Sequence, residues 1–283
     1  MIYDICGIRL QFDYRFPDFF SSRIKSYETT GIEPDYHMNV QIVEAITPPD
    51  AKPMLCFRDR TVLHGDKYDY IVKMDPSEEI TDLIRFTEDL HHIDIFLLQR
   101  IGKRLPEVEY LLTGMMFFEI AISNKMIPIH AAAVEYMGEA ILFSAPSQTG
   151  KSTQARLWRG QLPESRTINE DKPLLFQKDG VLMTGGTPWS GKTPENTNII
   201  APVKCIVFLE KAKQAELISL SNQEKVKLFL RNIHRPREEG KLAFVLETIE
   251  KVVYDTPVYL FKATKETDSF TYLYHAIYRG DHL

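Results

Sequence analysis

Hydrophobic and polar residues alternate along much of the first part of the chain. Residues 2–12 and 36–43 show the two-residue period that is typical of strands with one buried face. Residues 61–72 are interrupted by Gly65-Asp66, and this pattern predicts a hairpin that turns at that dipeptide. The first part of the chain is therefore expected to be mostly extended.

The pattern becomes helical at Ser77, a candidate N-cap followed by two glutamates, although a strand near residues 93–96 remains an alternative within this stretch. The strongest helical run is 105–123. Apolar residues cover much of its circumference, so we expect a buried helix there. We place a domain boundary in this helical stretch, with a smaller α+β domain in residues 1–100 and a second domain in residues 101–283.

Beyond residue 123, short apolar runs alternate with loops and with longer helical patterns. Runs rich in β-branched and aromatic residues predict strands, whereas a helical period over a longer segment predicts a helix. The strands are expected at 127–136, 140–144, 181–183, 205–209 and 258–261, and the helices at 154–159, 222–232 and 238–251.

The composition fits a soluble chain with a sizeable core. Its 283 residues, 44% of them hydrophobic, suffice for one large or two modest domains. The net charge of -5 argues against a general nucleic-acid-binding surface. Three cysteines lie far apart and signal neither a disulfide framework nor a zinc site. The sequence shows no signal peptide and no apolar run long enough to span a bilayer, so we expect a cytoplasmic protein without membrane or nucleic-acid partners.

Residues 138–153 combine a strand, a loop and the start of a helix in the order that binds phosphate. The apolar run ends before Pro146, and the loop leads into Gly150-Lys151-Ser152-Thr153 at the head of a helical pattern. In such a segment loop amides and the positive end of the helix converge on an anion, while the lysine adds a charge and the serine hydroxyl can bind a metal. Candidate nucleotide-binding residues are Ser147, Gln148, Thr149, Gly150, Lys151, Ser152 and Thr153.

One position departs from the Gly-x-x-x-x-Gly-Lys-Ser pattern, because Ala145 stands where the first glycine is usual. Alanine is the smallest replacement and is tolerated where φ is negative. A chance Gly-Lys-Ser in a loop is the alternative, and it does not explain the strand before and the helix after it.

A histidine precedes this segment on a strand-like run. Residues 127–136 are expected to form a hairpin with the strand that feeds the loop, turning at Met137-Gly138, and His130 lies 15 residues before Ala145. The hairpin would return His130 to the side of the nucleotide. A core histidine bonded to the backbone is the competing interpretation.

Two adjacent carboxylates, Glu170-Asp171, follow Lys151 by about 20 residues and lie near an expected strand. Phosphoryl transfer requires a metal that bridges phosphates and a carboxylate near the attacking hydroxyl. The pair is therefore a candidate for magnesium binding and proton acceptance, and an acidic surface turn is the alternative.

Two further segments are weaker candidates. The constrained loop 185–195 carries Lys192, a candidate phosphate ligand, and Glu195, a candidate metal ligand, with simple solvent exposure of each side chain as the alternative. Its Trp189 either stacks on a base or covers the core. A third group, Arg231, Arg235 and Arg237, suits a phosphate or an acidic peptide, with a basic exposed helix end as the alternative.

Together these segments resemble the kinase domain of HPr kinase/phosphorylase and its relatives over roughly residues 110–265. In that family a histidine-bearing hairpin leads into a strand and a Gly-Lys-Ser loop, and a strand with paired acids follows; the corresponding segments here are 130–135, 145–153 and 170–174. The resemblance implies an α/β fold in which a P-loop domain is built on a mixed sheet, related to that of phosphoenolpyruvate carboxykinase.

The resemblance also implies roles for individual residues. Lys151 and Ser152 would hold the phosphates of ATP and Mg²⁺, and Asp171 would be the general base for an acceptor serine. The family pair is usually two aspartates, so Glu170 is a departure and would assist at the metal. The resulting candidate catalytic residues are Asp171, Glu170, His130 and Lys151; the candidate metal ligands are Ser152, Glu170, Asp171 and Glu195; and Lys192 and Arg237 are added to the nucleotide-binding residues.

The glycine-rich signature linked to phosphorolysis is not visible in residues 185–195. The chain therefore resembles the divergent HPr-kinase-like proteins, some of which accompany peptide-modification pathways and phosphorylate a serine of a small peptide. We expect an ATP- and magnesium-dependent kinase with a peptide or small-protein partner. Its N-terminal domain is a candidate for substrate recruitment, and a homo-oligomer is left open.

Two other classes remain. Carboxykinase chemistry on a small organic acid is one, although no lysine-histidine-aspartate set for a second metal is evident. A nucleotide-binding sensor without turnover is the other, and Ala145 and Glu170 are the features that favour it. The cluster His91-His92-Ile93-Asp94 is interpreted as structural, because adjacent side chains point in different directions.

Overall fold

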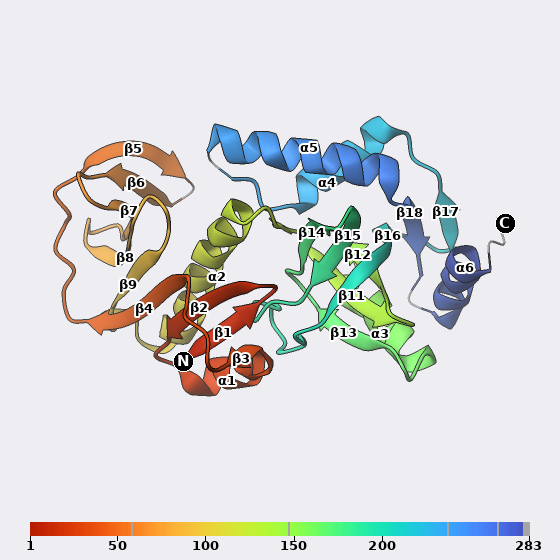
Figure 1. The fold of residues 1–283 in the computed structure, drawn as a ribbon, viewed down its shortest axis with the longest axis horizontal. Helices are drawn as coiled ribbons and strands as arrows, with labels where there is room; N and C mark the ends of the chain where they lie inside the picture. Colours follow the sequence, from red (N-terminus) through yellow and green to blue (C-terminus); the bar gives the residue numbers. More distant parts are fainter. Residues whose placement is uncertain (58, 147, 237, 265, 280–283) are drawn as a thin grey trace. The chain divides into compact units, whose positions relative to one another are not determined.

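The computed structural model describes residues 1–57, 59–146, 148–236, 238–264 and 266–279. The chain is an α/β protein that divides into two compact units, Met1–Ile120 and Ala121–Leu283 (Figure 1). The division falls inside one long helix, whereas the sequence analysis placed it at residue 100. The 3-10 segment before this helix, residues 99–104, carries no buried residue. Burial of side chains therefore resumes only in the helix.

The first unit is built on a mixed sheet with the strand order β3-β1-β2-β4-β9-β8-β7-β6-β5. Strands β2, β4 and β9 run parallel to one another, and the other pairs are antiparallel. The strands are β1 (Ile2–Ile5), β2 (Ile8–Asp13), β3 (Glu28–Thr29), β4 (Tyr36–Val43), β5 (Lys52–Phe57), β6 (Arg60–His64), β7 (Asp69–Met74), β8 (Ile80–Phe86) and β9 (His92–Leu98). The helical segments are α1 (Pro17–Ile24), η1 (Lys25–Tyr27), η2 (Gln99–Arg104) and α2 (Leu105–Ser123).

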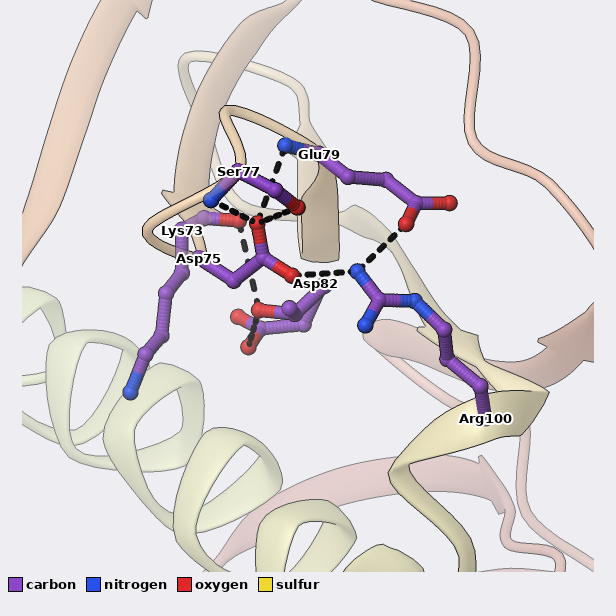
Figure 2. A network of polar contacts seen from close by, with 7 residues as sticks. Lys73, Asp75, Ser77, Glu79, Asp82 and Arg100 are labelled. Atoms are coloured by element: carbon purple, nitrogen blue, oxygen red, sulfur yellow. Dashed lines mark hydrogen bonds and ion pairs between the residues drawn. The ribbon is translucent and has the colours of Figure 1, made fainter.

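The helix expected to begin at Ser77 is wrong. Figure 2 shows the observed arrangement, a tight turn in which Asp75 Oδ1 accepts hydrogen bonds from the Ser77 amide at 2.8 Å and from the Glu79 amide at 3.1 Å. Arg100 forms ion pairs with Asp75 and Glu79. Residues 80–86 then pair with β7 on one side and β9 on the other, so strand pairing on both sides outweighs the local helical signal.

The other strong patterns of this unit are confirmed. The hairpin of β6 and β7 turns at residues 65–68, β4 spans 36–43, and α2 spans Leu105–Ser123. The extended run 2–12 is two strands, because Cys6 and Gly7 both have positive φ, 56° and 89°, and form a tight turn. Among the described residues no helix is both long and apolar enough to cross a membrane.

A buried carboxylate fixes the start of helix α1. Glu109 on α2 is fully buried, and its two oxygens accept hydrogen bonds from the Arg15 amide at 2.5 Å and the Phe16 amide at 3.2 Å. Burial raises the pKa of Glu109 to about 7, although these two hydrogen bonds act in the opposite direction.

The second unit is built on a mixed sheet with the order β10-β14-β15-β16-β12-β11-β13, and β18 pairs with β16 and β17. Its strands are β10 (Ile127–Pro128), β11 (Ala131–Tyr136), β12 (Glu139–Ser144), β13 (Arg166–Asn169), β14 (Leu174–Lys178), β15 (Val181–Gly185), β16 (Ile200–Lys211), β17 (Glu216–Ile218) and β18 (Val258–Ala263). Its helices are α3 (Lys151–Gln161), α4 (Asn222–Asn232), α5 (Glu239–Asp255) and α6 (Thr267–Tyr278).

Helices cover both faces of this second sheet. Alternate residues of β11 and β12 point to opposite faces: Ala131, Ala133 and Leu142 pack with α4 and α5, whereas Val134 and Phe143 pack with α3 and α6 (Figure 1). The central strands β12, β16 and β18 run parallel, and this places their carboxyl ends at one edge of the sheet.

The expected hairpin at Met137-Gly138 is confirmed, as are β12, α4 and β18. Helix α4 begins at a capping box in which Ser221 and Glu224 exchange hydrogen bonds. Helix α6 has no counterpart among the sequence-based predictions.

We expect the stability of the first unit to fall as pH rises from 5 to 7.5. A carboxyl whose pKa is raised in the folded state favours folding when it is protonated, so this contribution is lost as pH rises from the unfolded value of about 4.3 through about 7. In Glu109→Gln this loss should be much smaller. Hydrogen exchange of the α1 amides at pH 5 and 7.5 measures the effect in both proteins, and an equal pH dependence in the two would contradict it.

Candidate functional site

The loop between β12 and α3 leads directly into the N-terminus of a helix. Gly150, with φ of 127°, caps the N-terminus of α3, and Gln148 has φ of 64°. The positive end of the α3 dipole therefore lies where this loop ends. Ala145 has no positive φ and is 1% exposed, with its methyl group in the core that contains Phe143 and Trp158. The replacement of the first glycine is thus accommodated, as expected for a negative φ.

The helix that follows presents a buried face with helical spacing. Lys151, Gln154, Ala155 and Trp158 are buried on α3 and anchor the loop to the sheet. Ser152 is half-buried and Thr153 is exposed on the first turn. The helix thus holds the first-turn residues of the predicted phosphate site on a rigid support.

Lys151 turns back from the helix toward the loop and toward the neighbouring strand. Its Nζ donates to the Ala145 carbonyl at 3.1 Å and lies 3.0 Å from His130 Nε2. Burial lowers the pKa of Lys151 to about 8, although the nearby Asp171 acts in the opposite direction. The ammonium is therefore held in a partly desolvated position where an additional anion would stabilise it.

His130 lies between β10 and β11, and both its amide and its carbonyl form hydrogen bonds. Its amide donates to the Asn232 carbonyl at 2.6 Å, and its own carbonyl accepts from Ser144 Oγ at 3.0 Å. The imidazole is not a core histidine bonded to the backbone, because its Nε2 faces Lys151 and lies 3.1 Å from Asp171 Oδ1. One ring nitrogen therefore adjoins a cation and a carboxylate, and its proton decides which contact is a hydrogen bond.

The position of Asp171 is set by the buried amide of Asn169, which is fully buried at the end of β13. Asn169 Oδ1 accepts from the Asp171 amide at 2.7 Å and from the Lys172 amide at 2.6 Å, and Asn169 Nδ2 donates to the Thr187 carbonyl at 2.8 Å. The Asp171 carbonyl accepts from the Ala131 amide at 3.2 Å. The chain thus turns sharply after β13, and the turn places the Asp171 carboxylate beside His130.

The charges around Asp171 favour its ionised form. Burial raises its pKa, but the hydrogen bond with His130 and the charges of Lys172 and Lys151 outweigh burial and hold the pKa below its usual value. Asp171 is therefore ionised at neutral pH and available as a proton acceptor.

The two adjacent acids have different surroundings. Glu170 is 6% exposed, and its carboxylate accepts from Thr193 Oγ1 at 3.0 Å and lies 3.5 Å from Arg159 Nη2. The same guanidinium donates to Glu195 Oε2 at 2.9 Å. Glu170 and Glu195, both predicted metal ligands, are thus brought together, but Arg159 from α3 occupies the position of the shared cation. Arg159 was not singled out from the sequence, because its role depends on a helix face that meets a distant loop.

The loop that carries Lys192 approaches Asp171 closely. Gly191 has φ of 82°, and a Cβ at this position would lie 2.9 Å from the Asp171 Cβ. Lys192 is exposed, whereas Trp189 is 2% exposed and lies in the interior, so it covers the core and is not available for base stacking. The loop thus contributes a tight backbone contact with Asp171.

The arginine-containing segment lies beside His130. The His234 amide donates to the Pro128 carbonyl at 2.9 Å, and Ile233 forms an isolated bridge with Ile129. Arg231 and Arg235 are exposed on this segment. Two predicted residues, Ser147 and Arg237, lie outside the described residues.

We expect Arg159→Gln to destabilise the second unit by about 1–3 kcal/mol, because it leaves the buried Glu170 carboxylate without its cation. Arg156→Gln on the exposed side of the same helix serves as the control, with an effect within about 0.5 kcal/mol. Urea unfolding of these variants and of Arg159→Gln/Glu170→Gln measures the coupling. The double variant should recover part of the loss, and additive losses would contradict the pairing.

We expect Gly191→Ala to be more destabilising than Gly180→Ala by about 1–3 kcal/mol. Both glycines have positive φ, 82° and 78°, but a Cβ at Gly180 meets nothing within 4 Å, whereas one at Gly191 meets Asp171. Gly180→Ala therefore isolates the backbone cost that both variants share. Equal unfolding midpoints in urea would show that the contact with Asp171 is easily relieved.

Comparisons with known proteins add a limited fold-level likeness. No protein-family model matches the chain, and no curated protein matches it either. Among solved structures the chain is similar to the HPr(Ser) kinase/phosphatase from Coxiella burnetii, at 15% identity over 33% of this chain, with a TM-score of 0.23. The match covers 64% of that protein's own length, less than two thirds. The similarity is a weak structural one.

Proposed function

We propose that the protein is an ATP- and magnesium-dependent kinase that transfers the γ-phosphoryl group to a serine hydroxyl of a peptide or small protein. The observation that carries this proposal is the convergence of Lys151, His130 and Asp171 beside the loop at the positive end of α3. A phosphate cradle and an ionised carboxylate at the same place are the two components that phosphoryl transfer to a hydroxyl needs.

The cradle binds the phosphates through charge and backbone dipoles. Loop amides and the α3 N-terminus supply hydrogen-bond donors. Lys151 supplies a cation, and its Nζ lies 3.1 Å from the Ala145 carbonyl oxygen in the same loop. Because burial lowers the pKa of Lys151 to about 8, an arriving phosphate stabilises the protonated lysine and is itself neutralised. A bound phosphate therefore stabilises the charged form of Lys151 more than it would stabilise that of an exposed lysine.

The residues present fit a magnesium ion that is bound largely through phosphates. Among the described residues no group of three or more His, Cys, Asp or Glu side chains is placed to hold a metal. Mg²⁺ in kinases usually takes one or two carboxylates and completes its shell with phosphates and water. Ser152 and Asp171 would hold it here, while Glu170 and Glu195 are engaged by Arg159. The bound ion would neutralise charge on the transferring phosphoryl group.

Asp171 is the residue best placed to take the proton of the acceptor hydroxyl. Its carboxylate is ionised at neutral pH, is oriented by Asn169 through the backbone, and faces His130 at 3.1 Å. As the hydroxyl oxygen forms its bond to phosphorus, its proton moves to Asp171, and the bond from phosphorus to the leaving ADP oxygen breaks. Lys151 then stabilises the charge that develops on the phosphates.

The acceptor class rests on the family resemblance and on the two-unit organisation. A serine of a peptide would need a surface for its flanking residues, and the first unit, which carries none of the cradle residues, is a candidate for that task. The peptide or small-protein partner and the cytoplasmic location are likewise part of this proposal, and a homo-oligomer is left open.

We expect Asp171→Asn to reduce phosphoryl transfer at least about 10²-fold while ATP binding measured without Mg²⁺ changes little, because the variant removes the proton acceptor and keeps the cradle. Transfer of labelled phosphate from ATP to a panel of serine-containing peptides, together with calorimetry of ATP binding, measures both quantities. Full activity in the variant would remove Asp171 from the mechanism.

Lys151→Ala provides the contrasting variant, since it should weaken ATP binding itself. Unchanged ATP affinity in this variant would contradict the cradle. Tight ATP binding by the unaltered protein without transfer to any peptide would favour the sensor, and turnover that depends on oxaloacetate would favour carboxykinase chemistry.

A further inference from the structure

The segment that ends helix α4 and follows it, residues 231–235, has no role in the proposed function, yet the backbone holds it beside His130. The His130 amide donates to the Asn232 carbonyl at 2.6 Å, and the His234 amide donates to the Pro128 carbonyl at 2.9 Å. These two hydrogen bonds run in opposite directions between the two stretches of chain. The segment is therefore fixed along one edge of the stretch that carries His130.

The opposite edge of the same stretch adjoins the proposed base. The Ala131 amide donates to the Asp171 carbonyl at 3.2 Å, and His130 Nε2 lies 3.1 Å from Asp171 Oδ1. His130 thus lies between the chain at Asp171 and the segment 231–235. An acceptor serine whose hydroxyl reaches Asp171 would have its neighbouring residues close to both.

Two cations of this segment are exposed. Among the described residues, neither Arg231 nor Arg235 has an ion-pair or hydrogen-bond partner for its guanidinium. Arg231 lies in the last turn of α4, where the helix dipole favours a cation. Arg235 lies beyond the helix, so the dipole does not account for it. Its Cα is at most about 7 Å from that of Ile233, which forms a bridge with Ile129 beside His130.

Two lysines extend the positive charge to other sides of Asp171. The charge of Lys172 helps to hold the pKa of Asp171 below its usual value. Lys192 is exposed and follows Gly191, where a Cβ would lie 2.9 Å from the Asp171 Cβ. The surroundings of the proposed base are thus basic, although the whole chain has a net charge of -5.

The carboxylates that lie near these cations in the sequence already have a favourable partner or position. They are Glu170, Glu195, Glu238 and Glu239. Arg159 engages the first two, and Lys241 pairs with the third. The last lies in the first turn of α5, where the helix dipole stabilises an anion. Arg231 and Arg235 therefore remain available to a bound molecule.

We propose that this basic surface, formed by Lys172, Lys192, Arg231 and Arg235, binds acidic residues next to the acceptor serine, so that the substrate is an acidic peptide segment. The inference rests on the proposed function, since it presumes that a serine hydroxyl reaches Asp171. A carboxylate pairs with a guanidinium in a bidentate, charge-assisted geometry that a neutral amide of the same shape does not reproduce. The first unit remains a candidate for more distant residues of the same peptide.

A pair of peptides tests the inference, one with aspartates on both sides of a single serine and one with asparagines at the same positions. At low ionic strength, kcat/KM should be at least about tenfold higher for the aspartate peptide, the combined effect of several exposed ion pairs. The difference should lie in KM and should shrink as salt is added, because salt screens exposed charges. Equal kcat/KM for the two peptides overturns the inference and leaves the proposed kinase intact.

Arg235→Gln should reduce this preference about two- to fivefold, the contribution of one exposed ion pair. Lys251→Gln removes an exposed cation of α5 that is not part of the basic surface, and it should leave the preference unchanged. Calorimetry of ATP binding separates the two anions that Arg235 could serve. A loss of ATP affinity in Arg235→Gln with an unchanged peptide preference overturns the inference.

Charge reversal gives a result that partial unfolding cannot imitate. Arg235→Glu should raise kcat/KM for a third peptide, with lysines in place of the aspartates, above the value in the unaltered protein. No gain in a folded variant overturns the inference, and the peptide pair still tests it on the unaltered protein if the variant does not fold. Failure of the unaltered protein to phosphorylate any peptide contradicts the proposed function, and the inference with it.

Discussion

The site depends on one buried side chain, the amide of Asn169. It holds the amides of Asp171 and Lys172 at 2.7 and 2.6 Å and donates to the carbonyl of Thr187 at 2.8 Å. Because each of these groups is buried or partly buried, losing the amide would leave several of them unpaired at once. The turn it maintains directs Asp171 toward His130, and the same contact fixes the loop that leads to Gly191. Strand β13, the acidic pair and the following loop therefore form one structural unit, to which the cradle adds Lys151.

The two carboxylates that are adjacent in sequence, those of Glu170 and Asp171, have different surroundings. Asp171 adjoins His130 and Lys151 and keeps a depressed pKa, whereas Glu170 is directed to Arg159 and Thr193. The first arrangement leaves a charged group available for chemistry. The second uses a charge to attach a helix to a loop, because a buried carboxylate requires a partner. This division accounts for a glutamate at the first position, since its longer side chain reaches across to α3.

Much of the second unit was predictable because its signals are local. The β12 strand, the Gly150-Lys151 loop and the hairpin at Met137-Gly138 depend on apolar runs and turn residues that lie within a few positions of each other. The first unit shows the limit of such signals, since Ser77 resembled a helix cap while pairing with two neighbouring strands made residues 80–86 a strand. The contacts of Arg159 with Glu170 and Glu195 depend on segments far apart in the sequence, which no local pattern reveals.

A crystal structure with Mg²⁺ and a non-hydrolysable ATP analogue tests the central claim most directly, because it fixes the direction of the phosphate chain. We predict that the β- and γ-phosphates lie at the α3 N-terminus within hydrogen-bonding distance of Lys151, with the γ-phosphate on the side of Asp171 and His130. Phosphates bound away from Lys151, or a γ-phosphate directed away from Asp171 and His130, would contradict the account.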